Sequence, residues 1–493
     1  MKMRSLLLLT VFFFICLPVF SQDDYNQNTD SVFIIDSFTF NINGITRPDA
    51  IIYKAELKKG EEITGLDSLN KYIRDKTQIL VNERVLDTVK LDYILGEMRE
   101  DGKFPVNLII DIKDTWNIIV LPNPKYSSNT GFEIILKARD YNFLGTMSPL
   151  RLDIGYRYDE QGRNSFFLML DSNTPFRAFG LNWSFKFLNN FDFRPDTEKP
   201  FYYGNTTGLS VELPFSFTTI TVGFNESINL NEENDDVNKP LYGNFQDGLY
   251  MSSNPYISLR IPTGINAGIW GELVYTPEIS ASFNHEFSKW PLDETRKGPF
   301  LEIKNNLGFS RIDWIGNFQR GFDVYIDNSN SFDFNRPNRD GKTLSVNFTT
   351  SGTGHFTITD FFGVSARLMY RHWFFHEHST EAADALRGIL DKNIGPDYML
   401  SLNLNLTVRV LRFLPSVWFN NENLRIFNFD LHLSPITDTA FSDNIFYVTG
   451  GMEAIFFPEF FRSLLLRVSL GWNLADFSGG RSRELYIGTD LHY

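Results

Sequence analysis

The chain has 493 residues, enough for two or three ordinary domains or for one large barrel with a small appended domain. The formal net charge of −14 argues against a nucleic-acid partner, because phosphate binding depends on a basic surface. Aromatic residues make up 15% of the chain, yet the mean hydropathy is only −0.20. Beyond the N-terminus, no apolar run is as long as a transmembrane helix. This combination favours strands that alternate lipid-facing and water-facing residues.

The N-terminus has the pattern of a secretory signal peptide. Lys2 and Arg4 form a basic start, and an apolar run follows over residues 6–19. The alternative is a membrane anchor, but this run is shorter than the roughly 20 residues that a spanning helix needs. We therefore predict a signal peptide over residues 1–21 and a flexible polar leader over residues 22–30.

Cysteine usage argues against thiol chemistry. Cys16 is the only cysteine, and it lies inside the predicted signal peptide. Phe14 and Ile15 precede it, whereas a lipoprotein signal has a small residue directly before its cysteine. We therefore expect neither a lipid anchor nor a disulfide.

Residues 31–117 are predicted to form a small α+β domain in the order strand, helix, helix, strand, strand. Thr46 is placed to cap the first helix, with Asp49 three residues on in the reciprocal position of a capping box. Apolar residues at helical spacing mark the second helix, and strict alternation marks the last strand. The five elements are expected over residues 32–42, 48–58, 66–80, 85–97 and 106–112.

Strand patterns dominate from residue 118 to the end of the chain. Over residues 398–411, aliphatic side chains alternate strictly with polar ones, and the same alternation recurs over residues 150–157 and 464–472. A secreted β-sandwich also alternates and is the alternative. Charged residues recur on the second face, however, which in a closed barrel is a polar lumen.

The links between the predicted strands alternate in length. Short links on one side and long loops on the other are typical of outer-membrane barrels, with the long loops outside. We predict an all-β transmembrane barrel over residues 118–493, with about 16 antiparallel strands, possibly 18. The count from residue 130 is about seventeen, or eighteen if residues 118–126 also form a strand. Short links are expected at 173–177, 262–266, 313–316, 359–361 and 458–460, and long loops at 189–204, 232–246, 284–297, 329–341 and 376–397.

Three short motifs occur at telling places. Asn142-Phe143-Leu144-Gly145 follows an early predicted strand, Leu386-Arg387-Gly388-Ile389 lies in the longest loop, and Ser434-Pro435-Ile436-Thr437-Asp438 lies on a later strand. Five strands are expected after Gly388, over residues 398–411, 425–436, 444–457, 461–473 and 482–493. In order and spacing, these features resemble the BamA/TamA superfamily of outer-membrane assembly and translocation barrels, which carry periplasmic POTRA domains.

The resemblance implies a role for each motif. Residues 142–145 correspond to the turn at the end of an early barrel strand, and residues 386–389 to the tip of a loop that folds back into the lumen. Asp438 corresponds to the wall carboxylate that accepts the loop arginine. Three departures stand out: Ile389 replaces an aromatic residue, the family norm is sixteen strands, and the central assembly machines carry several POTRA domains.

Elementary chemistry supports a pairing of Arg387 with Asp438. A guanidinium in a confined lumen needs an acidic partner, and one carboxylate can accept two of its N–H groups. Gly388 lets the loop tip turn and approach the wall closely. Our hypothesis is a lock that pins the loop inside the barrel, and the alternative is a solvated loop arginine. The tripeptide Arg320-Gly321-Phe322 matches the family's loop-tip motif more closely in sequence, but we interpret it as part of a strand.

The chain ends in a predicted strand that would meet the first barrel strand at a seam. This strand is expected over residues 484–493. The seam residues are Leu485, Ile487, Gly488, Leu491 and Tyr493, and all of them except Gly488 are expected on the outward face together with Thr489.

No catalytic residue, cofactor or metal is predicted. The chain has no Gly-x-Ser-x-Gly elbow, and nothing marks a nucleophile with its base. His372, His376 and His378 share one strand face and could hold a metal. With the neighbouring aromatic residues 373–375, they fit a membrane-interface rim better.

The resemblance implies a barrel in the bacterial outer membrane, with its N-terminal domain in the periplasm. It would assist the insertion of outer-membrane proteins or the translocation of polypeptides, without catalysis. Its partners would be outer-membrane lipid, unfolded outer-membrane or exported polypeptides, and periplasmic or lipoprotein accessory subunits. Clients would bind by strand addition to the domain's sheet edge, and the seam would open. A passive pore, a lipid-handling barrel and a structural subunit of an envelope complex are the alternatives.

Overall fold

The structure is a computed structural model. It describes residues 31–493 except 128–130, 159–161, 197–199, 231–247, 267–270, 288–291, 293–296, 336–342, 375–385, 390–396, 443, 476–482, 490 and 492–493. The predicted signal peptide and leader lie outside the described residues. Among the described helices, none is long and apolar enough to cross a membrane.

The N-terminal domain has one four-stranded sheet in the order β2-β1-β4-β3. Strands β1 and β4 are parallel, and the other neighbours are antiparallel. Alternating residues of β4 (Val106, Leu108, Ile110) are fully buried against Leu69 and Leu80 of α3. The elements are β1 (Val32–Asn43), α2 (Pro48–Lys54), β2 (Glu62–Thr64), α3 (Leu66–Asn82), β3 (Leu86–Leu95) and β4 (Lys103–Asp114).

This order confirms the predicted α+β fold and adds the short strand β2. The predicted helix cap is wrong. The Thr46 side chain donates to Asp114 Oδ1 at 2.6 Å instead, and helix α2 starts at Pro48 without a side-chain cap. A hydrogen bond from the Thr46 hydroxyl to a charged carboxylate is stronger than the neutral bond that the same hydroxyl would accept from a helix N–H.

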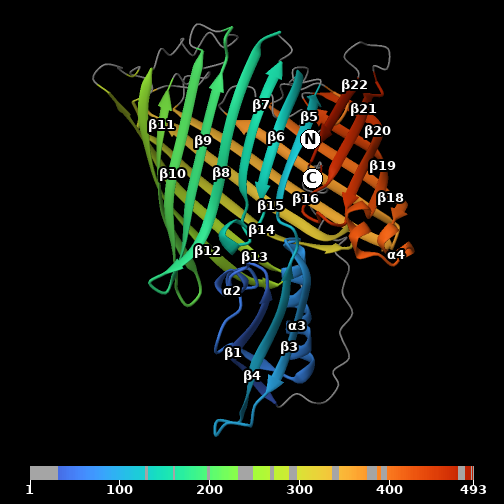
Figure 1. Cartoon of the computed structure of the whole chain (residues 1–493). Coiled ribbons are helices and arrows are strands. Elements are labelled where there is room, and N and C mark those ends of the chain that lie inside the picture. Colours follow the sequence, from blue (N-terminus) through green and yellow to red (C-terminus); the bar gives the residue numbers. More distant parts are fainter. Residues whose placement is uncertain are drawn as a thin grey trace.

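The second part of the chain forms a closed barrel in which consecutive strands are neighbours (Figure 1). Residues 118–126 do form a strand, so the barrel has eighteen strands, β5 to β22. They are β5 (Ile118–Ser127), β6 (Gly131–Asp140), β7 (Leu150–Tyr158), β8 (Asn164–Ala178), β9 (Leu181–Phe193), β10 (Phe201–Pro214), β11 (Thr219–Leu230), β12 (Leu249–Asn266), β13 (Glu272–Glu286), β14 (Phe300–Ile315), β15 (Phe318–Asp333), β16 (Leu344–Thr359), β17 (Phe362–Phe374), β18 (Tyr398–Phe413), β19 (Phe429–Ser442), β20 (Ile445–Pro458), β21 (Leu466–Asn473) and β22 (Arg483–Gly488).

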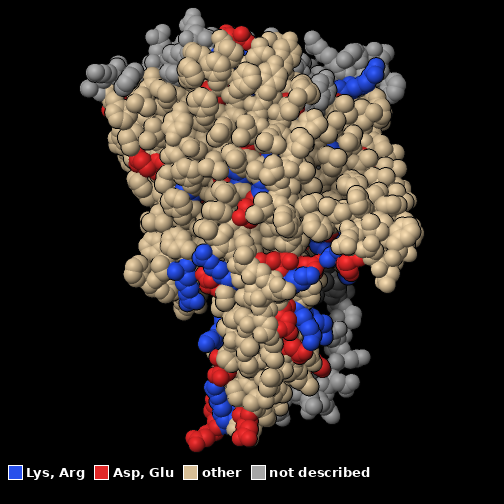
Figure 2. Space-filling model, in the orientation of Figure 1, with Lys and Arg blue, Asp and Glu red and all other residues tan. Residues whose placement is uncertain are grey.

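The barrel wall is apolar outside and polar inside. On β6, Phe132, Ile134 and Leu136 are exposed on the outer face, whereas Glu133 and Ile135 are buried on the inner face. A wall of this polarity suits a membrane, because lipid can cover its outer side and water its inner side. In Figure 2 the barrel wall carries few charged residues, and charges gather where the barrel meets the N-terminal domain.

The N-terminal domain sits at the end of the barrel where most links are short (Figure 1). Several predicted link positions are corrected. Residues 173–177 and 262–266 belong to strands β8 and β12, and residues 425–428 are not part of β19. The link between β18 and β19 instead holds α4 (Pro415–Trp418) and the short helix η6 (Glu422–Phe427).

Candidate functional site: the lumen loop, the domain junction and the seam

The tip of the loop between β17 and β18 lies against the inner wall. The Arg387 guanidinium donates from Nε to Asp438 Oδ2 at 2.9 Å and from Nη2 to Oδ1 at 2.5 Å. The backbone N–H of Arg387 donates to the same Oδ2 at 2.9 Å. The structure thus brings the two residues together, with exposed fractions of 5% for Arg387 and 0% for Asp438.

Three further charged side chains, missed by the sequence analysis, complete this cluster. Glu453 on β20 lies 3.2 Å from Arg387 Nη1, and Arg467 on β21 donates to the same carboxylate oxygen at 3.0 Å. Glu484 on β22 accepts the backbone N–H of Gly388 at 2.8 Å. All three lie on the inward face of an alternating strand, which was the available signal.

Gly388 makes the close approach possible. Its φ is +100°, and a Cβ added there would lie 2.6 Å from the backbone nitrogen of Trp472. Gly471 faces it, with its own added Cβ 2.7 Å from Gly388 N. Leu386 and Ile389 on either side of the pair are buried against a patch of Met369, Trp373, Met399 and Ala440.

The predicted early barrel turn is the first junction with the N-terminal domain. It forms a single 3-10 turn at Phe143–Gly145, with Leu144 at a φ of +54°. Gly145 accepts the backbone N–H of Arg47 at 2.9 Å, and its added Cβ would lie 2.1 Å from Ile45 O. The φ of Gly145 itself is +72°, and this φ and this contact both require glycine at position 145.

Asn142 binds the two parts of the chain to each other. Its amide donates to Thr46 Oγ1 at 2.7 Å and to Asp114 Oδ2 at 3.2 Å. Its side-chain oxygen accepts the N–H of Met147 at 2.8 Å, and Met147 is buried in the core of the N-terminal domain. Residues 142–147, which belong to the β6–β7 turn of the barrel, therefore insert into the N-terminal domain, and we call them the peg.

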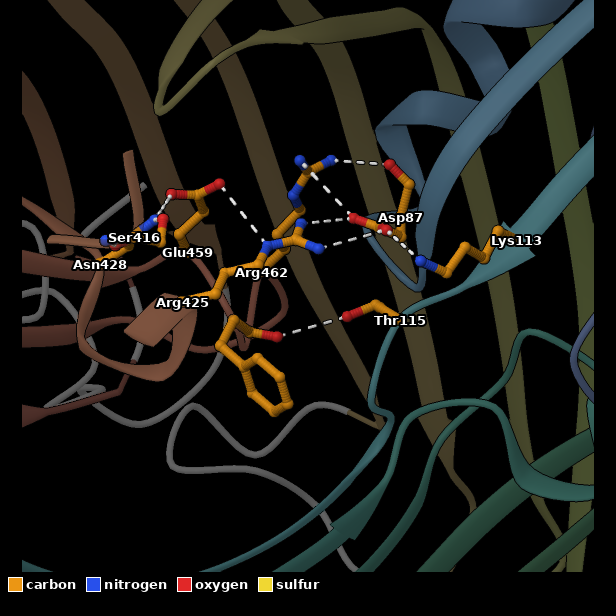
Figure 3. A network of polar contacts seen from close by, with 9 residues as sticks. Asp87, Lys113, Thr115, Ser416, Arg425, Asn428, Glu459 and Arg462 are labelled. Atoms are coloured by element: carbon orange, nitrogen blue, oxygen red, sulfur yellow. Dashed lines mark hydrogen bonds and ion pairs between the residues drawn. The ribbon is translucent and has the colours of Figure 1, made fainter. Parts of the chain in front are cut away.

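A second junction lies across the mouth of the barrel, at the start of β3 (Figure 3). Asp87 accepts from Arg425 Nη2 at 2.7 Å and lies 3.2 Å from Lys113 Nζ and 3.9 Å from Arg462 Nη2. Burial raises the pKa of the Asp87 carboxyl, but the hydrogen bonds and charges of these three cations outweigh burial and hold the pKa below its usual range.

Arg84 strengthens this second junction from the turn after α3. It donates to Arg462 O at 2.6 Å and stacks over the Trp314 ring at 4.2 Å from its centre. Burial, together with the positive charge of Arg462, lowers the pKa of Arg84 to about 10. The domain is thus held to the barrel at several places, because Asn82 of α3 also donates to Asp313 at 2.8 Å and Tyr53 of α2 donates to Glu212 at 3.1 Å.

The seam between β22 and β5 is the weakest contact in the described barrel. A single residue pair, Tyr486–Ser127, joins these strands, whereas ten pairs join β5 to β6 and six join β21 to β22. Among the described residues, the rest of the β5 edge has no strand partner. Leu485 and Ile487 lie on the outer face with Leu470 and Val468, as predicted.

Two prolines face the open edge of β5. Asn117 O accepts from Tyr141 on the β6 side, so odd-numbered residues of β5 direct their backbone groups to β6 and even-numbered ones to the seam. Pro122 and Pro124 are even-numbered and have no N–H. The seam edge of β5 therefore lacks two hydrogen-bond donors.

The two described residues after Gly488, Thr489 and Leu491, do not continue the predicted strand. Strand β22 ends at Gly488, Thr489 accepts from the inward-facing Lys137 at 3.0 Å, and Leu491 lines a small cavity of 50 Å³ inside the barrel. The prediction that Thr489 and Leu491 face outward is therefore wrong. Tyr493 lies outside the described residues.

The described residues offer no metal site. They contain no group of three or more side chains suited to hold a metal ion. His372 stacks on Phe374 at 3.7 Å and hydrogen-bonds Tyr370, whereas His376 and His378 lie outside the described residues.

The comparisons give structural likeness alone. No family model and no curated protein matches the chain. Among solved structures, the chain is similar to CdiB from Acinetobacter baumannii, with 12% identity and a TM-score of 0.45 over 92% of this chain and 73% of that one. CdiB from Escherichia coli has 9% identity and a TM-score of 0.41 over 96% of this chain and 92% of that one. BamA from Haemophilus ducreyi lacking POTRA domains 1–3 has 11% identity and a TM-score of 0.39 over 94% of this chain and 85% of that one.

The chain is a closed antiparallel barrel with an apolar outer face and a small α+β domain before it, which is the fold that the sequence predicted. The likeness to the solved structures is distant, so the description of the site rests on the contacts within this chain.

Proposed function

We propose that this barrel assists the insertion of outer-membrane proteins or the translocation of polypeptides across the outer membrane, without catalysis and with its N-terminal domain in the periplasm. The observation that carries the proposal is the weak seam. Among the residues that the structure describes, one pair closes it, and the β5 edge lacks two donors. An unpaired strand edge recruits other strands, because its backbone groups need partners.

The N-terminal domain offers a second edge for the same purpose. In the described sheet, β3 pairs with β4 on one side only, so its other edge has no strand partner, although Asp87 O at its start accepts from Arg462 at 3.2 Å. A client in extended conformation would add to this edge through main-chain hydrogen bonds, which read little sequence. The junction at Asp87, at the barrel end of β3, would then direct the client towards the mouth of the barrel.

A reversible lock of the seam tests this role. Ser127→Cys with Tyr486→Cys joins directly paired residues, whose Cα separation in an antiparallel ladder suits a disulfide. Cys16→Ser removes the native cysteine from the background. In the host that depends on this protein, the oxidised lock should deplete assembled outer-membrane or exported proteins, and a reductant should restore them.

The control is Asn189→Cys with Asn205→Cys, a directly paired position of the β9–β10 ladder away from the seam. It should form a disulfide without affecting clients. A seam lock that closes fully and leaves client levels unchanged would exclude seam opening. Depletion of the whole protein, followed by quantification of the outer-membrane and surface proteomes, tests the role itself.

A pore is the second candidate, and one observation favours it. The side of the lumen lined by β8 to β15 encloses a cavity of 860 Å³ whose lining is rich in Ser, Asn and Thr, including Asn225 and Asn254. The described part of the Arg387 loop lies against the opposite wall. Steady conductance in planar bilayers, with an unchanged proteome after depletion but altered permeability or lipid asymmetry, would favour a pore or lipid-handling barrel.

A further inference from the structure

The link between β18 and β19, residues 414–428, is longer than strand reversal requires. Neighbouring links at the same end of the barrel need only the pairs Gly316–Asn317 and Asp360–Phe361. We call residues 414–428 the rim loop. It runs through α4 and η6 beside the barrel wall, at the end that carries the N-terminal domain (Figure 1).

Hydrogen bonds within the rim loop hold it in a defined conformation. Asn428, 2% exposed, closes its base by donating to Ser416 Oγ at 2.6 Å and to Glu459 Oε2 at 2.8 Å. Asn421 caps η6 by accepting the N–H of Asn423 at 3.0 Å. Side chains on this loop are therefore presented in fixed directions.

Five large apolar side chains of the rim loop are exposed. Trp418 is 57% and Phe419 is 71% exposed, and Val417, Ile426 and Phe427 are exposed as well. Five such residues on one short, ordered segment are more than the scattered apolar residues of an ordinary surface, so a partner is expected to cover them.

The apolar side chains continue the lipid-facing wall. Trp418 packs edge-on against Phe413 with ring centres 5.0 Å apart. Phe413 packs on Phe429 at 5.3 Å, and Phe429 on Phe456 at 4.7 Å, which carries the aromatic patch across the outer faces of β18, β19 and β20. The surface of the rim loop and the lipid-facing surface thus form one patch.

The polar side chains of the rim loop point elsewhere. Arg425 donates to Asp87 of the N-terminal domain at 2.7 Å and lies 3.8 Å from Glu459 (Figure 3). The loop is therefore amphipathic. One side binds the domain, and the other continues the wall.

We propose that the rim loop is an interfacial membrane-binding element, with Val417, Trp418 and Phe419 seated at the boundary between headgroups and acyl chains of the periplasmic leaflet. Continuity with the lipid-facing aromatic patch favours lipid over a protein partner. Aromatic residues prefer this boundary, and interfacial helices bury their apolar side about 5–10 Å into it. The inference rests on the barrel lying in a bilayer and not on any assembly role.

Lipid-bound quenchers test this placement. The full chain with Cys16→Ser and Phe419→Cys is labelled with a fluorophore and folded into phosphatidylethanolamine/phosphatidylglycerol vesicles. These vesicles carry a nitroxide lipid labelled either at the headgroup or at the end of the acyl chain. We expect strong loss of fluorescence with the headgroup nitroxide, weaker loss with the deep nitroxide, and protection from iodide in water.

Met98→Cys is the matched control, because Met98 is also an exposed apolar residue but lies at the far end of the β3–β4 hairpin. Its label should be quenched by iodide and not by either lipid. Val417→Cys repeats the test if the Phe419 variant folds poorly. Labels at 417 and 419 that behave like the label at 98 would overturn the proposal and leave the patch for a protein partner.

Discussion

At the scale of single residues, the charged side chains around Arg387 in the lumen share their partners. Glu453 contacts both Arg387 and Arg467, and Glu484 holds the backbone of the same loop tip. Because a buried charge without a partner is costly, each member of such a cluster depends on the others. The acidic members lie on β19, β20 and β22, so the loop tip ties the final strands of the barrel to one another.

Asp438→Asn should release the loop tip. The variant keeps the volume of the side chain but leaves Arg387 with one carboxylate fewer, and breaking a buried pair costs about 3–5 kcal/mol. The measurement is the rate at which protease cuts the folded barrel between β17 and β18. Asp171→Asn is the control, since its pair with Arg151 at 3.3 Å is largely exposed and is worth roughly 0–1 kcal/mol. Equal cutting rates in the two variants would contradict the lock.

Gly388→Ala should release the tip with every charge in place. The new methyl group would meet the backbone of β21 at 2.6 Å, and the φ of +100° would be strained. Gly316→Ala is the matched control, because Gly316 has a φ of +63° but open space around it. We expect faster proteolysis of the loop in the first variant alone. Similar behaviour of both would show that backbone strain, and not the close approach to the wall, explains the effect.

At the scale of elements, the junction at β3 should depend on pH. The pKa of Asp87 is lowered in the folded protein, so its contribution is complete above the ordinary carboxyl pKa of about 4 and is lost as the pH falls through the lowered value. We expect spin labels at Glu97→Cys and Phe361→Cys to give a sharp distance at neutral pH and a broad one at acid pH.

Asp87→Asn should broaden that distance already at neutral pH. Asp92→Asn is the control, because Asp92 lies on the same strand but has its partners on the exposed surface of the domain, Lys90 at 3.3 Å and the backbone N–H of Tyr93 at 3.0 Å. The Asn142 junction remains in both variants, so the domain should loosen without leaving the barrel. A sharp distance at all pH values would show that Asp87 does not control the junction.

The sequence predicts some of these elements well and others poorly, for physical reasons. Strict alternation identified the strands, because period-two burial is written directly in residue order. Register is not written there, so the pairing of Glu453 with Arg467 across β20 and β21 was not foreseen. Thr489 and Leu491 stand in a stretch that alternates like a strand, but a place in the wall also needs donors on the facing edge, where Pro122 and Pro124 have none.

The prediction that residues 425–428 begin a strand is wrong for a local reason. Phe427 and Asn428 continue the alternation of β19 backwards along the chain, yet Asn421 and Asn428 hold this segment in a loop through side-chain hydrogen bonds. Such bonds compete with strand pairing and leave no trace in hydrophobic periodicity. The Arg387–Asp438 pairing, in contrast, was suggested by the resemblance of the motifs, and the structure places the two side chains in contact.

At the scale of the whole molecule, the two faces of the wall should respond differently to charge. Leu136→Arg places a cation on the outer face of β6 and should destabilise the barrel in lipid by about 2–4 kcal/mol near mid-membrane. Asn254→Arg places the same cation on the lumen wall and should cost little. Equilibrium unfolding in guanidinium from lipid vesicles measures both. Equal losses would argue that lipid does not cover the outer face.

The peg at residues 142–147 has a consequence for the order of folding. Met147 is 3% exposed inside the core of the N-terminal domain, although the β6–β7 turn supplies it. A fragment that ends at residue 117 would lack this side chain, and a missing core methionine costs about 2–5 kcal/mol. The domain precedes the barrel in the chain, yet it acquires its full stability only after the β6–β7 turn, which follows the first barrel hairpin, has formed. Maturation of the leading domain therefore reports that the barrel has begun to assemble.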